Sequence, residues 1–248
     1  MLDISYKSEH IRIMPAKNSI KDYSNNSYYH VYNRGVEKRL IFQDKQDYAV
    51  FLSYLQTYLM PKDMELFTQQ LSDPLLSSRE KDKILNMLKL NNFADEIILL
   101  AYCLMPNHFH FLLKQKNANS MDKFMNSLCT RYTMYFNKKY ERVGSLYQDV
   151  YKAVTVFTDE QLLNVSHYIH KNPVKDHPRL RTQGVPLRAY FSQPSSYPEY
   201  LGQRKTEWIH PEEILFHFSN SNSNNSYQNF IEESDNLPFI DLNENEVK

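Results

Sequence analysis

Residues 97–113, with the sequence IILLAYCLMPNHFHFLL, decide the fold of this chain. Apolar residues dominate 97–104 and 108–113, and each run has the length of a β-strand. The segment between them, Met105-Pro106-Asn107, contains proline and asparagine, which favour tight turns. The stretch therefore predicts two antiparallel strands that are neighbours in one sheet.

The second of these strands carries the motif His108-Phe109-His110. On a strand, residues i and i+2 project from the same face, so the two imidazoles should lie side by side while Phe109 and Phe111 point into the core. Two imidazoles on an open sheet face can hold one divalent ion and leave positions for a third ligand and a phosphate oxygen. Taken alone, a His-x-His pair is more often structural than a metal site.

Hydrophobic periodicity on either side of this hairpin predicts the other elements of the fold. In chain order they are a strand at 28–33, a helix at 45–59, the two strands above, a helix at 121–139, a strand at 150–156 and a helix at 158–171. Up to the last helix, the order β-α-β-β-α-β is that of the split βαβ, ferredoxin-like arrangement. This is an α+β fold with a four-stranded antiparallel sheet and helices on one face. Such a sheet leaves its other face free for ligands.

Both ends of the last predicted helix are marked in the sequence. Thr158 and Gln161 have the spacing of a capping box, in which two side chains satisfy the first free amides of a helix. At the other end Asn172 precedes Pro173, and a residue before proline is pushed out of the helical region. The helix should therefore run from Thr158 to about Lys171 and fray at Asn172.

This helix carries a tyrosine that can serve as a nucleophile. Tyr168 and Asn172 are four residues apart, so they lie on one side of the helix, next to its apolar stripe. A phenol has an unperturbed pKa near ~10 and needs help as a nucleophile, which a cation polarising the attacked phosphate can give. The neighbouring His167 and His170 should point away from Tyr168. Seen alone, Tyr168 would more often be structural.

Composition bounds the class of protein. The chain has 248 residues, of which 42% are hydrophobic, enough for one sizeable domain, and 14% are aromatic. Aromatic rings supply flat faces on which nucleobases can stack. The formal net charge is zero, which argues against indiscriminate binding to a polyanion. Local basic segments carry the charge argument instead: Arg131, Lys138, Lys139 and Arg142, and separately Lys171, Lys175, Arg179 and Arg181.

The chain divides by pattern into three parts. We expect an N-terminal arm at 1–27, a catalytic domain at 28–183 with an insertion at 60–95, and a partly disordered C-terminal extension at 184–248. The insertion should contain a helix at 78–90 and the extension a short one near 211–218. No apolar run approaches the ~18 residues of a membrane span, so we expect a soluble, cytoplasmic protein. Without paired spacing, Cys103 and Cys129 should be buried thiols.

Several of these segments resemble one known family. Residues 101–113, AYCLMPNHFHFLL, are similar to the metal-binding segment of the single-tyrosine HUH transposases. Residues 168–175, YIHKNPVK, resemble the tyrosine helix of the REP-associated tyrosine transposases within that family. Further similar segments are HVYNRG at 30–35, IF at 41–42 and GSLYQ at 144–148. The resemblance spans roughly residues 28–175.

The resemblance implies a ferredoxin-like fold and transesterification on single-stranded DNA. By resemblance, His108 and His110 would be metal ligands, Asn172 would complete the site, and Tyr168 would be the nucleophile. The implied metal is Mg²⁺ or Mn²⁺, and attack by Tyr168 would leave a 5′-phosphotyrosine and a free 3′-hydroxyl. The partner would be single-stranded or hairpin DNA, bound by a monomer or homodimer. The candidate DNA contacts are Arg34, Arg131, Lys152, Lys171 and Lys175.

Two other classes of function remain open at this stage. A ferredoxin-like sheet with exposed aromatic residues is also how many RNA-binding modules stack bases, although the RNP aromatic pattern is absent. A metal-dependent phosphoesterase would use activated water, and Tyr168 would then be a bystander. A covalent protein–DNA adduct distinguishes the three.

Overall fold

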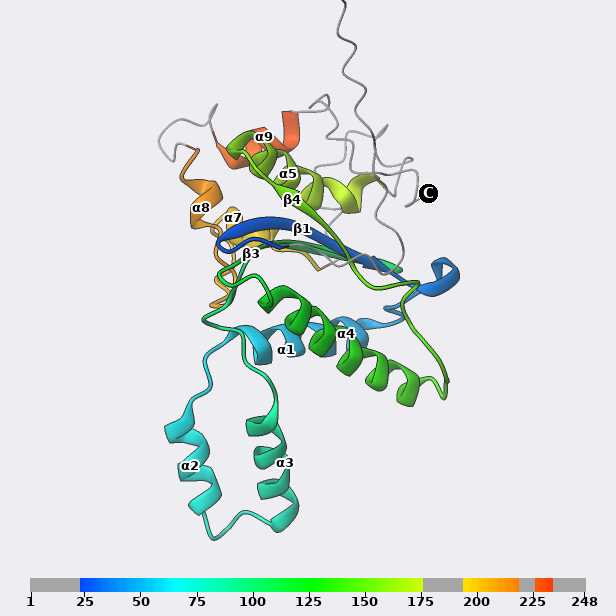
Figure 1. Ribbon diagram of the computed structural model, residues 1–248, viewed down its shortest axis with the longest axis vertical. Helices are drawn as coiled ribbons and strands as arrows, with labels where there is room; N and C mark the ends of the chain where they lie inside the picture. Colours follow the sequence, from blue (N-terminus) through cyan, green and yellow to red (C-terminus); the bar gives the residue numbers. More distant parts are fainter. Residues whose placement is uncertain (1–22, 176–193, 219–225, 234–248) are drawn as a thin grey trace, which may run out of the picture.

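A computed structural model describes residues 23–175, 194–218 and 226–233 of the chain. Four antiparallel strands form one sheet in the order β2-β3-β1-β4 (Figure 1). The strands are, in chain order, β1 (Ser27–Arg34), β2 (Ile97–Met105), β3 (His108–Gln115) and β4 (Lys152–Val156). With two helices between the strands, this is the ferredoxin-like arrangement. The predicted α+β fold class is therefore confirmed.

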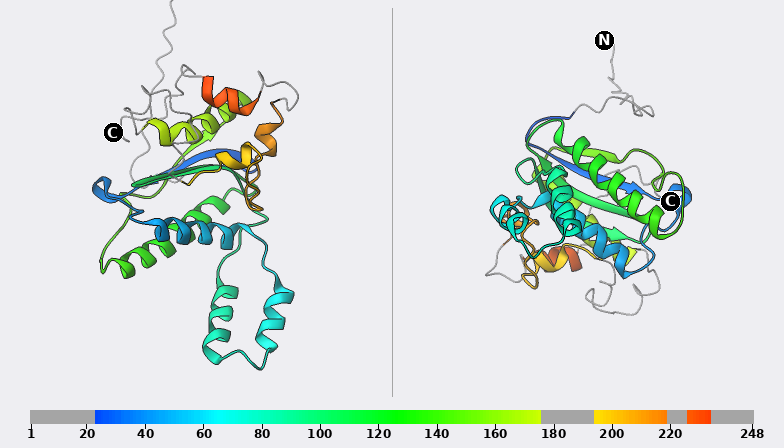
Figure 2. Two further views of the ribbon diagram at one scale, coloured as in Figure 1. Left: turned by 180° about the vertical axis from the view of Figure 1, so that it is seen from behind. Right: turned by 90° about the horizontal axis from the view of Figure 1, so that it is seen from below.

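Helices α1 (Lys45–Leu59) and α4 (Ser120–Lys139) cover one face of the sheet (Figures 1 and 2). The layer between helices and sheet is filled by fully buried aromatic rings, including Phe51 of α1, Phe111 of β3 and Phe124 of α4. Aromatic side chains each bury a large apolar area, so this layer is the main hydrophobic core. Helix α1 has the predicted bounds.

The opposite face of the sheet is partly covered, which corrects the expectation that it is free. Helix α5 (Asp159–Lys175) packs against β2 and β3. Apolar side chains of this face, such as Leu112, are fully buried against Val165 and Ile169 of α5. Burial of these side chains is favourable, so a helix covers the apolar half of the face. Short helices complete the cover: α7 (Tyr197–Tyr200), α8 (Glu212–Leu215) and α9 (Tyr227–Glu233).

Helix α5 begins as predicted but ends later. The Thr158 hydroxyl accepts a hydrogen bond from the Gln161 amide at 3.1 Å, and the Gln161 side chain accepts one from the Phe157 amide at 2.8 Å. The helix then continues through Pro173 to Lys175, so the expected fraying at Asn172 is wrong. Asn172 and Pro173 are both buried, and this packing offsets the backbone hydrogen bond that proline cannot make.

The predicted insertion is a helical hairpin that projects away from the sheet (Figure 1). It consists of α2 (Met64–Ser72) and α3 (Ser78–Lys89), and the sequence pattern indicated only the second. Helix α2 was missed although its cap is visible in the sequence, since the Asp63 carboxylate accepts from the Leu66 amide at 2.8 Å. At the base of the hairpin, the Phe93 amide donates to the Tyr58 carbonyl at 2.8 Å, which holds the two ends of the insertion together.

The described residues of the predicted C-terminal extension pack against β2. The Leu104 amide donates to the Pro194 carbonyl at 2.9 Å, and the Ser196 amide donates to the Tyr102 carbonyl at 3.0 Å. The predicted helix near 211–218 corresponds to α8. The described residues do not include most of the N-terminal arm, Arg179, Arg181 or the end of the chain. The domain boundaries stay predictions, although this part of the extension shares a hydrophobic core with α5.

Gly35 joins β1 to the turn that precedes His108. Its amide donates to the Asn107 carbonyl at 2.9 Å, and a Cβ at this position would run into the carbonyl oxygen of Arg39. We expect Gly35→Ala to lower the free energy of unfolding by about 1–3 kcal/mol, the usual cost of overpacking. Urea denaturation followed by circular dichroism measures the change. An unchanged midpoint would mean that the Arg39 backbone can retreat without cost.

Candidate active site

Strand β3 presents His108 and His110 side by side on the face that carries α5. Their ring centroids are 5.0 Å apart, with an interplanar angle of 89°. In the β1–β3 ladder His110 pairs with Tyr32 and His108 pairs with Arg34, so these four side chains share one sheet face. Phe109 lies on the opposite face and is fully buried in the main core. The predicted alternation along β3 is therefore confirmed.

The ring nitrogens of His108 have different partners. Nδ1 lies 2.6 Å from Oδ1 of Asn107, and an amide oxygen can only accept, so Nδ1 carries the proton. The Asn172 side chain also hydrogen-bonds to His108. Burial and, after it, the charge of Arg34 lower the pKa of His108, the hydrogen bond to Asn172 raises it, and together they bring this pKa to about 4. In the uncharged ring Nδ1 therefore carries the proton and Nε2 the lone pair.

Helix α5 places Tyr168 against this histidine pair. The ring of Tyr168 lies edge-on to His110, with centroids 5.2 Å apart, and edge-on to His30 at 5.7 Å. Tyr168 is half-buried, whereas Asn172, one helical turn later, is 5% exposed. The four predicted site residues His108, His110, Tyr168 and Asn172 therefore come together, although they belong to elements far apart in the sequence.

His30 on β1 is a further member of the site, and sequence reasoning did not assign it a role. Its Nε2 lies 2.9 Å from Nδ1 of His110, and the two rings are stacked with an interplanar angle of 14°. His30 is 1% exposed, and burial lowers its pKa to about 3. The alternation His30, Tyr32, Arg34 on a strand predicted to join the same sheet was the available signal.

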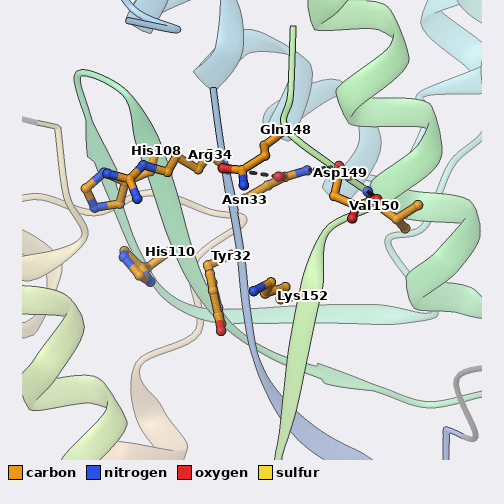
Figure 3. A pocket seen from close by; sticks show the side chains of 9 residues that line it. All are labelled: Tyr32, Asn33, Arg34, His108, His110, Gln148, Asp149, Val150 and Lys152. Carbon is orange, nitrogen blue, oxygen red and sulfur yellow. Dashed lines mark hydrogen bonds between the residues drawn. The ribbon is translucent and has the colours of Figure 1, made fainter. Parts of the chain in front are cut away.

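A pocket of about 350 Å³ lies next to the histidine pair, on the side of β1 and β4 (Figure 3). Two of the predicted DNA contacts, Arg34 and Lys152, line it together with the ring of Tyr32. Burial lowers the pKa of Lys152, and the carboxylate of Asp149 acts in the opposite direction. Two basic side chains and an aromatic face suit a phosphate and its attached base. The other lining residues are Asn33, Gln148, Asp149 and Val150.

Two other predicted DNA contacts, Arg131 and Lys171, do not line this pocket. Arg131 lies on α4, on the far side of the sheet, with its guanidinium 3.9 Å from the ring centroid of Tyr54. Lys171 is buried within α5 at 6% exposure. Lys175 is the last residue of α5, and its side chain is outside the described part of the chain. Arg131 was predicted as a DNA contact from its charge alone. Charge does not show which face of the sheet the helix of Arg131 covers.

Two tyrosines of α4 and the second histidine of α5 beyond the site have structural partners. Tyr132 donates to the Ile41 carbonyl at 2.6 Å and Tyr135 donates to Asp47 at 3.0 Å, both on the side of α1 and α4. His170 is fully buried in α5, with its ring nitrogens 2.6 Å from the Tyr227 hydroxyl and 2.8 Å from the Ser196 hydroxyl. Neither tyrosine can approach His108 and His110, and His170 points away from Tyr168 as predicted.

The donor set of the site is two imidazoles and an amide. Within the described ranges, no group of three or more His, Cys, Asp or Glu side chains could hold a metal ion. Any ion at His108 and His110 would therefore need Asn172, water or a phosphate oxygen as further ligands. Cys103 is buried as predicted, whereas Cys129 is half-buried, and neither is in a disulfide. No described helix is long and apolar enough to cross a membrane.

Comparison with known proteins gives a match to a family and matches to solved structures. Residues 66–172 match the family described as "Transposase IS200 like". A structure described as a REP-associated tyrosine transposase bound to a REP hairpin is 8% identical, with a TM-score of 0.38. That match covers 77% of this chain and 96% of the other. No curated protein matches the chain.

Proposed function

We propose, from the premise that residues 66–172 form an IS200-like transposase segment, that this protein nicks and rejoins single-stranded DNA through Tyr168. The observation that carries the proposal is the meeting of Tyr168 and Asn172 of α5 with His108 and His110 of β3. The half-buried tyrosine ring against His110 favours a tyrosine nucleophile over activated water, which would need no phenol at this place.

The reaction follows from the groups present. The Tyr168 oxygen attacks a backbone phosphorus, a Tyr–O–P bond forms and the P–O3′ bond breaks. The phenolic proton is passed on overall to the leaving 3′-oxygen. The products are a 5′-phosphotyrosine and a free 3′-hydroxyl. Because one phosphoester replaces another, a 3′-hydroxyl can attack in reverse and rejoin the strand. Arg34 and Lys152 in the pocket would hold the phosphate backbone in register.

His108, His110 and Asn172 suit a divalent ion such as Mg²⁺ or Mn²⁺. Nδ1 of His108 is hydrogen-bonded to Asn107, so Nε2 is the nitrogen that would bind a metal. Both neutral imidazole and amide oxygen are acceptable ligands, although imidazole alone would favour a softer metal. When bound, the ion would supply a Lewis acid that stabilises charge on the attacked phosphate.

The test is to incubate the protein with end-labelled single-stranded and hairpin DNA in the presence of Mn²⁺. We expect a band that survives denaturing electrophoresis and carries the 5′ phosphate on tyrosine. Nicked DNA with a free 5′-phosphate and no adduct would indicate a phosphoesterase. Binding without cleavage of either DNA would indicate a non-catalytic nucleic-acid-binding protein.

We also expect a hairpin with a single-stranded flank to bind better than a blunt duplex of the same sequence. The formal net charge of zero gives little duplex-wide attraction, whereas Tyr32 in the pocket can stack on an unpaired base. Stacking contributes ~1–3 kcal/mol per base, or about 5- to 150-fold in affinity. Fluorescence anisotropy at one fixed salt concentration measures the ratio. Equal affinity for the two DNAs would contradict the stacking argument.

A further inference from the structure

We infer that His30 is a positioning residue that fixes the tautomer and ring orientation of His110. The inference rests on the proposed function, in which His110 binds a divalent ion. It assigns a role to a buried histidine from a strand outside the matched segment 66–172. The role is to accept a hydrogen bond from Nδ1 of His110, so that the Nε2 lone pair of His110 is left for the metal.

The geometry of the pair is set by the β1–β3 ladder. His30 is opposite Leu112 in the register and Tyr32 is opposite His110, so His30 and His110 are diagonal neighbours on one face. The Nε2–Nδ1 distance is 2.9 Å and the ring centroids are 5.1 Å apart. His30 is 1% exposed, so bulk water does not compete for this contact. The ladder therefore supplies a built hydrogen-bond partner for His110.

Counting protons shows why this partner matters. Two neutral imidazoles carry one ring proton each, and the shared hydrogen bond uses one of them. If His30 donates, the proton of His110 must sit on Nε2, and Nε2 cannot bind a metal. If His110 donates, its Nε2 is a free lone pair and the proton of His30 sits on Nδ1. Only the second arrangement is compatible with a metal ion at Nε2 of His110, and both have the same total charge.

The second histidine of the pair is arranged in the same way. Nδ1 of His108 faces Oδ1 of Asn107, which can only accept, so His108 has the tautomer in which Nε2 is free. The hydrogen bond at 3.4 Å from the Asn107 amide nitrogen to the Lys38 carbonyl supports this placement of the amide oxygen. Each metal-facing imidazole therefore has its Nδ1 held by a neighbour, as is usual for metal-ligating histidines.

His30 does not join the site as a third ligand. Its Nε2 is directed at Nδ1 of His110, and Nδ1 of His30 has no hydrogen-bond partner among the described residues. No set of three His, Cys, Asp or Glu side chains in that part of the chain is placed to share an ion. In the positioning role His30 uses Nε2, the nitrogen that contacts Nδ1 of His110. This role also explains why a polar ring is kept in a place where leucine would fill the space without a desolvation cost.

The test compares His30→Gln with His30→Leu in the full-length protein. Glutamine can accept from Nδ1 of His110, whereas leucine leaves that buried N–H without an acceptor. We expect the Mn²⁺ affinity, measured by calorimetry and by electron paramagnetic resonance, to fall about 10- to 100-fold in His30→Leu. His30→Gln should stay within a few-fold of wild type. Thermal melting checks that both variants fold, and hairpin binding in EDTA should not separate them.

The outcomes separate this inference from the proposed function. Loss of Mn²⁺ binding in His108→Ala but not in His30→Leu would overturn the positioning role and leave the metal site intact. Equal loss in His30→Leu and His30→Gln would also overturn it. If wild type binds no Mn²⁺, the positioning role of His30 and the proposed metal site both fail. If a covalent adduct then still forms without metal, the proposed role of Tyr168 alone remains.

A measurement on wild type covers the case in which neither variant folds. Ring ¹⁵N chemical shifts in the presence of Mg²⁺ report which nitrogen of His110 is protonated. We expect a protonated Nδ1 and an unprotonated Nε2. A proton on Nε2 of His110 in the Mg²⁺-loaded protein would overturn the inference.

Discussion

We expect Tyr168→Phe to abolish the covalent protein–DNA adduct and to slow strand nicking by about 10³-fold or more, while hairpin affinity stays within a few-fold of wild type. The substitution removes one hydroxyl and keeps the ring against His110 and His30, so the packing of α5 is unchanged. Loss of a nucleophile acts on the chemical step and not on ground-state binding. Denaturing electrophoresis of labelled DNA and anisotropy measure the two quantities.

The matched control is Tyr135→Phe, which also removes one phenolic hydroxyl. Tyr135 donates to Asp47 at 3.0 Å on the side of the sheet covered by α1 and α4. We expect this variant to form the adduct at the wild-type rate. Nicking by Tyr168→Phe with a hydrolysed 5′-phosphate would identify water as the nucleophile. An adduct that maps to another tyrosine would preserve the reaction class and reject Tyr168.

We expect His108→Ala and His110→Ala each to lower the affinity for Mn²⁺ by at least about 100-fold and to abolish metal-dependent nicking. The magnitude follows because even the hydrogen-bond partners of metal ligands are worth 10- to 100-fold in affinity. Calorimetry with Mn²⁺ measures the binding, and thermal melting checks that the variants fold, since both rings are buried. Removing either ring also leaves a polar partner, Asn107 or His30, without its hydrogen bond.

His210→Ala is the control for these variants, because the His210 side chain is 48% exposed and lies outside the site. It should bind Mn²⁺ and form the adduct as wild type does. If His108→Ala and His110→Ala bound Mn²⁺ like this control, the ion would be held elsewhere. Two neutral imidazoles would then need another explanation for their place beside Tyr168.

Local patterns in the sequence predicted the sheet and the histidine pair well. The two-residue turn at Pro106 and Asn107 sets the register Met105↔His108, and the alternation along β3 then fixes which face each ring occupies. The helix at 45–59 was predicted to the residue from its apolar period. These features depend on residues close in sequence, so a single sequence is enough to predict them.

Contacts between distant segments could not be predicted in the same way. The neighbour of His110 on the sheet depends on the pairing of β1 with β3, and so His30 was left without a role. Charge singled out Arg131, but only the packing of α4 shows that it lies on the other side of the sheet. The end of α5 was placed too early because the burial of Pro173, a tertiary effect, outweighs its local preference.

The packing of α5 on the strands of its own chain has a consequence for stoichiometry. His108 and His110 come from β3, and Tyr168 and Asn172 come from the helix that rests on β2 and β3 of the same polypeptide. One copy of the chain therefore contains a complete set of the proposed catalytic groups. Association of two copies would change how many DNA ends are held together, but it would not be needed to assemble either centre. Dilution should leave the specific activity per chain unchanged.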